Sequence, residues 1–134
     1  MSRAQQRLVA ACQVLLAAHD EHSARMGSYA LLDAVGNNHA GTYGADALLM
    51  PAAVVTILGH GSPWACFGAI EALIDLCGSF EPEVGPLEPA AASLAPRLRL
   101  AAQDLLPTLL EFVNAHGVAA SSAAQLIELL SEPS

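Results

Sequence analysis

The sequence predicts an all-α fold, a right-handed α-solenoid of about three antiparallel helix pairs that form one domain over residues 1–134. Two observations lead to this prediction. The phrase LLDAVG at 31–36 returns as LIDLCG at 73–78 and, shortened, as LIEL at 126–129, so the copies begin 42 and 53 residues apart. Such spacings suit repeating units of two helices each. Apolar residues make up 54% of the chain, with Ala and Leu dominant and β-branched runs scarce, which favours packed helices.

The first predicted helix pair precedes residue 37. Its first helix spans about Ala4–Ala18, where one stripe at helical spacing consists of Leu8, Cys12, Leu15 and His19. A short second helix is expected over about Ser28–Val35. Gly36 follows it, and a glycine there suits the left-handed conformation that often ends a helix.

The second pair follows a loop, GNNHAGTYG at residues 36–44. A helix over about Ala45–Leu58 contains Pro51, and we expect a kink there because proline has no amide hydrogen to donate. After the turn GHGS, Ser62 is a good N-cap and Pro63 a good first residue for a helix that ends at Gly78.

The third pair begins after FEPEVGPLEP at residues 80–89, which we interpret as an irregular insertion that lengthens the second repeat spacing. A helix over about Leu94–Ala115 contains Pro107 and is stopped by Gly117. The last helix covers about Ser122–Leu130 and carries the third copy of the repeated phrase.

The pairs alternate in a recognisable way. LLMPAAVVTIL (48–58) and LLPTLLEFV (105–113) are first helices with an internal proline, and the repeated phrase closes each second helix. This pattern resembles the HEAT repeat, whose second helix carries an Ala-x-x-Ala-Leu core that Ala69, Ala72 and Leu73 match. The chain departs from HEAT repeats where Val-Arg is usual, with Ala65 and Cys66, and where a turn aspartate is usual, with Gly61.

The charge balance restricts the possible partners. The net charge is −8, from 13 acids against five arginines, and there is no lysine. Such a surface repels phosphate, so we expect no nucleic acid and no membrane as partner, and a basic protein is favoured. Near the N-terminus, the apolar run LVAACQVLLAA is broken by Gln13 and followed by HDEH, which does not fit a signal peptide. We expect a cytoplasmic protein.

The acid in the repeated phrase has a regular place. On the helix over 63–78, helical spacing puts Cys66, Ile70, Leu73, Ile74 and Cys77 on one side, and Trp64, Gly68, Glu71 and Asp75 on the other. Asp33 and Glu128 align with Asp75. Each second helix would therefore present one carboxylate on the concave face, where solenoids commonly bind partners. The alternative is that these acids only supply a solvated outer face.

A long unmixed stretch of negative charge favours a binding role. No basic residue occurs between Arg25 and Arg97, whereas seven acids do: Asp33, Asp46, Glu71, Asp75, Glu81, Glu83 and Glu88. One-signed charge repels itself and can steer a positive partner to rapid association. Trp64 beside these acids has the composition of an interface anchor, although it could equally pack against the GHG turn.

The sequence offers little for catalysis. A metal site at HDEH (19–22) would lack a third ligand, and the cysteines Cys12, Cys66 and Cys77 lie on apolar stripes. Asn38 and His39 in the loop could be polar site groups, or the loop could simply turn. We therefore expect no enzyme, no metal and no cofactor. A small metal-dependent enzyme centred on His39 and His60 remains a distant alternative.

Among small acidic α-solenoids, the chain resembles HEAT-like bacterial immunity proteins through GNNHAGTYG and GSPWACFGAIEALIDLCGSF. That resemblance implies a basic toxin domain, often a nuclease, as partner. The competing interpretation is a HEAT-like scaffold or regulatory module that binds another basic segment. The residues we predict to contact the partner are Asp33, Asn38, His39, Asp46, Trp64, Glu71, Asp75, Glu81 and Glu83.

Overall fold

The computed structural model describes residues 2–37, 42–43, 45–79, 81–82 and 89–131. Its α-helices are α1 (Arg3–Leu16), α2 (Glu21–Val35), α3 (Met50–His60), α4 (Pro63–Ser79), α5 (Pro89–Ala102), α6 (Leu106–Ala115) and α7 (Ala120–Ser131). Two 3₁₀ segments, η1 (Ala45–Leu49) and η2 (Gln103–Leu105), precede α3 and α6. Among the described residues, strands are limited to β1 (Gly36–Asn37), β2 (Thr42–Tyr43) and β3 (Glu81–Pro82). The predicted all-α class is confirmed.

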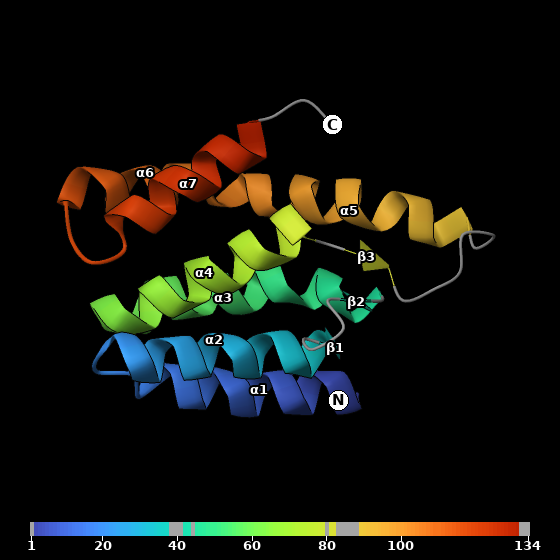
Figure 1. Cartoon of the computed structure of the whole chain (residues 1–134), viewed down its shortest axis with the longest axis horizontal. Coiled ribbons are helices and arrows are strands. Elements are labelled where there is room, and N and C mark those ends of the chain that lie inside the picture. Colours follow the sequence, from blue (N-terminus) through green and yellow to red (C-terminus); the bar gives the residue numbers. More distant parts are fainter. Residues whose placement is uncertain (1, 38–41, 44, 80, 83–88, 132–134) are drawn as a thin grey trace.

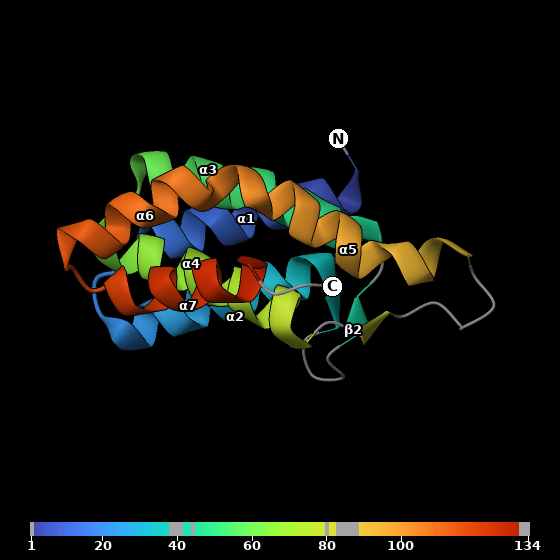
Figure 2. The same ribbon diagram turned by 90° about the horizontal axis from the view of Figure 1, so that it is seen from above.

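The helices pack in pairs that are stacked on one another. α1 contacts α2, α3 contacts α4, and α6 contacts α7, while α4 also lies between α2 and α7 (Figure 1). Seen from above, α1, α3, α5 and α6 form one layer and α2, α4 and α7 form another (Figure 2). We call these the first layer and the second layer. The second layer is continuous because α4 packs on a helix on each side.

The repeated phrase explains the core of the second layer. Its copies lie near the C-terminal ends of α2, α4 and α7, and the first leucine of each copy is completely buried: Leu31, Leu73 and Leu126. The fifth position is also buried. It is occupied by Val35 in the first copy, by Cys77 in the second, and by Leu130 directly after the shortened third copy. The chain repeats this phrase because each second helix must bury the same stripe against its neighbours.

α4 is buried over most of its circumference. Residues 65–70 are all buried, including Gly68, which the sequence places on the polar side. A Cβ on Gly68 would lie 2.5 Å from Leu15 Cδ1 and 2.7 Å from the Ala24 carbonyl oxygen. The predicted polar face of α4 is therefore wrong at Gly68, because α1 and α2 both pack against α4 at this position.

Helix starts follow capping groups. α2 begins at Glu21, seven residues before the predicted start, because Asp20 and Ser23 form a capping box in which the Asp20 carboxylate accepts from the Ser23 amide at 2.8 Å. HDEH thus surrounds a helix start: Asp20 is the N-cap, and Glu21 and His22 are the first two residues of α2. At α4, Ser62 acts as predicted: its hydroxyl accepts from the Ala65 amide at 3.3 Å and donates to the Ala18 carbonyl at 3.2 Å.

Prolines mark changes of helix type. Pro51 lies in the first turn of α3, directly after η1, and Pro107 lies in the first turn of α6, directly after η2. In place of the kink predicted at Pro51 there is a short 3₁₀ segment, and the helix predicted to run through Pro107 is interrupted in the same way; a proline in the first turn needs no amide partner. Pro96 differs from these two prolines because it lies in the interior of a helix, α5.

The connections differ from the prediction in three places. Gly36 has φ −179°, which is extended and not left-handed, and it begins β1. β1 pairs antiparallel with β2, which pairs parallel with β3, so Thr42 lies opposite Glu81 and part of the predicted insertion joins a small sheet. At the end of α6 the left-handed residue is His116 (φ 55°), one residue before the predicted stop at Gly117.

Arginine side chains from the first layer hold the C-terminal ends of second-layer helices. Arg7 Nη2 donates to the Asp33 carbonyl at 2.8 Å, at the end of α2. Arg99 donates to the Leu129 carbonyl at 3.1 Å and to the Cys77 carbonyl at 3.3 Å, so it joins the ends of α7 and α4. A positive charge near a helix C-terminus also interacts favourably with the negative end of the helix dipole and so stabilises the helix.

Candidate functional site

The predicted contact residues fall into three groups. Asn38, His39 and Glu83 lie outside the described residues, and Glu81 lies in β3 with its side chain not described. Glu71 and Asp75 lie on α4 and are brought together. Asp33, Asp46 and Trp64 lie elsewhere, as shown below.

A hollow of about 260 Å³ opens on the second layer between α2, α4 and α7. Its lining combines acidic, basic, aromatic and apolar side chains: Arg25, Ser28, Tyr29, Leu32, Glu71, Ile74, Asp75 and Gln125. We call it the second-layer hollow. The two α4 acids, Glu71 and Asp75, therefore lie in a concave site and not on a convex surface.

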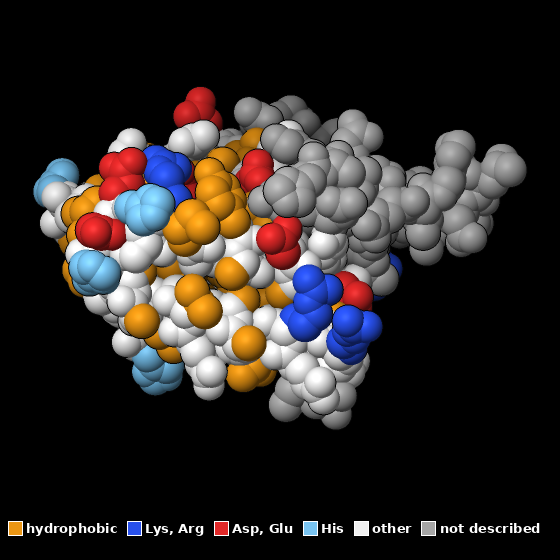
Figure 3. All heavy atoms as spheres, turned by 60° about the horizontal axis from the view of Figure 1, so that its bottom comes forward, with side chains coloured by type: hydrophobic (Ala, Val, Ile, Leu, Met, Phe, Trp, Pro, Cys, Tyr) orange, Lys and Arg blue, Asp and Glu red, His pale blue; other side chains and the backbone are white. Residues whose placement is uncertain are grey.

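Arg25 neutralises part of this site. Its guanidinium bonds the Glu21 carboxylate at 3.1 Å and the Glu71 carboxylate at 3.3 Å, and lies 5.3 Å from the centre of the Phe67 ring. The expectation of unneutralised acids is therefore wrong for Glu71, because Arg25 of the neighbouring helix α2 reaches it across the second layer. Figure 3 shows this face of α1 and α2, where acidic and basic side chains lie close together along one edge and at one end, and apolar side chains occupy the middle.

Asp75 has no such counter-charge. Among the described residues no ion pair includes its carboxylate, and the pKa of Asp75 is raised by partial burial first and by the nearby negative charge of Glu71 second. Both causes disfavour the charged form. A cation brought into the second-layer hollow would lower this electrostatic penalty.

Trp64 reaches the same region indirectly. It is half-buried at the start of α4, and its ring meets the Phe67 ring edge-on, with centroids 5.4 Å apart and planes at 84°. Phe67 in turn lies under Arg25. Trp64 does not line the second-layer hollow, so its role as a partner anchor stays a prediction.

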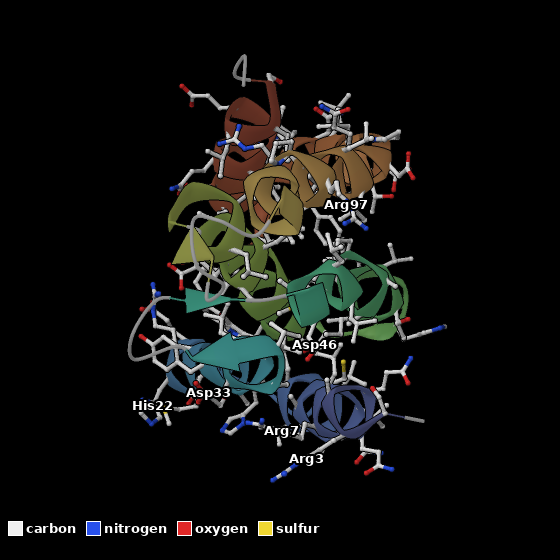
Figure 4. All side chains as sticks on the ribbon, turned by 90° about the vertical axis from the view of Figure 1, so that its right-hand side faces the viewer. Arg3, Arg7, His22, Asp33, Asp46 and Arg97 are labelled. Carbon is white, nitrogen blue, oxygen red and sulfur yellow. The ribbon has the colours of Figure 1, made fainter. Side chains whose placement is uncertain are left out.

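Asp33 and Asp46 lie away from the second-layer hollow, near the arginines of α1. Asp46 lines a second hollow of about 320 Å³ with Arg3 and Arg7, and Arg7 bonds the backbone oxygen of Asp33. Figure 4 shows these residues at the end of the molecule that carries the N-terminus of α1. The structure thus divides the predicted acidic face into two sites.

The remaining reactive groups are placed as follows. The described residues contain no group of three or more His, Cys, Asp or Glu side chains that could hold a metal ion. Cys66 and Cys77 are buried, as predicted from their apolar stripes, and burial raises the pKa of Cys77 to about 11. Burial raises the pKa of the Cys66 thiol as well, so both thiols are kept in the protonated, weakly nucleophilic form at neutral pH.

The sequence prediction missed an apolar groove in the first layer. It has a volume of about 510 Å³, lies between α1 and the η1–α3 segment, and includes Val9, Leu16 and Ala52 in its lining. The available signal was a second apolar stripe on the first helix, with Val9 and Leu16 seven residues apart beside the stripe of Leu8 and Leu15. We call it the first-layer groove.

Comparison with known proteins gives no relative: no protein-family model, no curated protein and no solved structure matches this chain. None of the described helices combines the length and the apolar composition needed to cross a membrane.

Proposed function

We propose that this chain is an immunity-type protein that binds a basic cognate toxin domain of the nuclease class and neutralises it by covering its active surface. The partner meets the second layer, and no cofactor or catalytic step is involved. In this proposal the scaffold is a right-handed, HEAT-like α-solenoid of antiparallel helix pairs that works in the cytoplasm.

The packing of the helices supports such a scaffold. The side chain of Arg7 donates a hydrogen bond to the backbone carbonyl of Asp33. Arg7 is near the start of α1 and Asp33 is near the end of α2, so this contact fits two helices that run antiparallel. The three copies of the repeated phrase lie in α2, α4 and α7, which follow one another through the second layer. Stacked helix pairs commonly use the surface of their second helices for binding.

The observation that carries the proposal is the unpaired carboxylate of Asp75 in the second-layer hollow. Tyr29 and Ile74 line the same hollow and can pack on the carbon chain of a lysine or arginine from the partner. A nuclease must attract phosphate, so its active surface is positive and complements this site. Covering that surface prevents nucleic acid from binding.

The test uses association kinetics with the native partner, found as the product of the adjacent gene or by pull-down from the source bacterium. Asp75→Lys reverses a charge in the second-layer hollow, and Glu111→Lys makes the same change on an exposed residue of α6 in the first layer. We expect Asp75→Lys to lower the association rate about tenfold at low salt, with the difference shrinking as salt screens the charges.

Glu111→Lys should bind like the unchanged protein apart from a small effect of net charge. If both variants lower the rate equally, the effect is long-range charge alone and the second-layer hollow is not the contact. Circular dichroism of each variant establishes that it is folded before its kinetics are compared.

A HEAT-like scaffold that binds a basic segment without inhibiting a toxin remains the second candidate, and the second-layer hollow suits it equally. Co-expression separates the two. An immunity protein restores the growth of cells that produce the toxin domain, and Asp75→Lys should weaken this rescue. A scaffold binds its partner but gives no protection.

A further inference from the structure

Two of the chain's five arginines lie in one hollow, at the end of the molecule that carries the N-terminus of α1 (Figure 4). Arg3 and Arg7 are four residues apart, so they lie one turn apart on the same face of α1. The hollow has a volume of about 320 Å³, and its lining includes the last residues of α2 and Asp46 of η1. We call it the arginine hollow.

The charges in the arginine hollow are not balanced. Within the described part of the chain, no ion pair includes Arg3, Arg7 or Asp46. Two arginines and one aspartate leave the hollow with a net charge of +1, although the chain as a whole carries −8. Like charges four residues apart on a helix repel one another. An anion bound between the two guanidiniums removes this repulsion.

Arg7 is already held in place for such a ligand. Its Nη2 donates a hydrogen bond to the Asp33 carbonyl at 2.8 Å, near the end of α2. That bond uses one of the N–H groups of the guanidinium and leaves the others for a ligand. A guanidinium that the protein already holds loses less side-chain freedom when a ligand binds.

We propose that the arginine hollow binds the C-terminal residue of a partner polypeptide. The terminal carboxylate accepts hydrogen bonds from Arg3 and Arg7, because the planar guanidinium matches the geometry of a carboxylate. The amide N–H of the same terminal residue donates to the Asp46 carboxylate. The arginine hollow shares none of its described lining residues with the second-layer hollow, so this proposal does not rest on the proposed function.

The charge of the arginine hollow selects this ligand. A chain end has one negative charge and a neutral amide, so it balances the net charge of +1 and supplies a donor for Asp46. A phosphate group carries more negative charge and is repelled by Asp46. A free amino acid has no net charge and leaves the +1 unbalanced. The volume of about 320 Å³ lies at the lower end of the range for ligand sites, which suits about one or two residues.

Nuclear magnetic resonance of the arginine side chains tests the site with N-acetylglycine, which has the carboxylate and the amide N–H of a chain end. We expect titration to move the Nε–Hε signals of Arg3 and Arg7 and to leave that of Arg97 unchanged, since Arg97 is an exposed arginine of α5 away from the hollow (Figure 4). The dissociation constant should be millimolar, because so small a ligand makes few contacts. Arg3 and Arg7 signals that stay in place overturn the proposal.

Arg3→Gln removes one guanidinium and should raise the dissociation constant about tenfold, as expected for the loss of a charge-assisted hydrogen bond. Arg3 is exposed, so the variant should keep its fold, which circular dichroism checks. Arg97→Gln is the matched control. It makes the same change on an exposed arginine that does not line the hollow, and it should bind like the unchanged protein. An equal loss in both variants is a general effect of charge and overturns the site.

Three further ligands test the choice of a chain end. Acetate has the carboxylate without an N–H, glycine has a free ammonium group, and inorganic phosphate has a larger charge. N-acetylglycine should bind more tightly than each of them, and Asp46→Ala should reduce its advantage over acetate and strengthen phosphate binding. A preference for glycine assigns the hollow to free amino acids and a preference for phosphate assigns it to phosphate groups, so either result overturns the proposal. Acetate that binds as tightly as N-acetylglycine overturns the role of Asp46.

Discussion

Single side chains in the second layer determine which acids remain available to a partner. Glu21, Glu71 and Asp75 are close in the fold, but Arg25 bonds two of them and leaves Asp75. No arginine or lysine lies between Arg25 and Arg97 in the sequence, yet the acids of this stretch are not all without a counter-charge in the fold. The sequence identified Glu71 and Asp75 correctly as neighbours, because helical spacing alone sets their relation. It could not reveal Arg25, which reaches them from another helix.

The raised pKa of Asp75 makes stability depend on pH. A carboxyl group whose pKa is higher in the folded protein than its ordinary 3.8 favours folding when protonated, and this contribution is lost as pH rises through the raised value. We therefore expect Asp75→Asn to raise the melting temperature at pH 7. The advantage should disappear at about pH 3, where both states are protonated. Thermal unfolding followed by circular dichroism at the two pH values measures it.

Glu111→Gln provides the comparison, since it removes one acid of the same chain from an exposed place on α6. An equal gain in melting temperature for both variants would mean that relief of overall negative charge, and not the surroundings of Asp75, is responsible. A gain confined to Asp75→Asn, together with weaker partner binding, would show that stability is given up at this position for binding.

Helices meet most closely where glycine allows it. Gly27 on α2 and Gly68 on α4 both face Leu15 of α1, and each would bring a Cβ within 2.8 Å of its side chain. The existence and type of the main helices could be predicted because each has a 3.6-residue apolar period. The burial of Gly68 could not, since it depends on how α4 packs against the α1–α2 pair. The short strands were missed because two-residue pairings have no period.

Alanine substitutions at two glycines separate helix propensity from packing. Gly68→Ala should destabilise the protein by about 2 kcal/mol or more, because the new Cβ meets the Ala24 carbonyl oxygen at 2.7 Å and the backbone must move. Gly59→Ala in α3 meets no atom within 4 Å and should stabilise by about 0.5–1 kcal/mol. Urea unfolding measures both, and a neutral Gly68→Ala would contradict the close approach of α4 to the α1–α2 pair.

The whole molecule presents two unlike surfaces. The second layer carries the second-layer hollow with its acids, and the first layer carries the uncharged first-layer groove. Figure 2 shows the two layers on opposite sides of the helix stack. Composition could predict the net charge and hence a basic partner. It could not predict that the two surfaces lie on different layers, because the number of alanines and valines in a chain is the same whether they fill a core or border a groove.

Because the second-layer hollow and the first-layer groove lie on different layers, a partner held at one of them leaves the other uncovered. We expect Val9→Glu, which places a charge in the first-layer groove, to leave the affinity for the toxin domain unchanged, whereas Asp75→Lys lowers it. Calorimetry with the two variants measures both affinities. If Val9→Glu weakens binding and Asp75→Lys does not, the toxin domain occupies the first-layer groove. The acids of the second layer then form a solvated surface, because the partner is held by apolar contacts on the other side of the molecule.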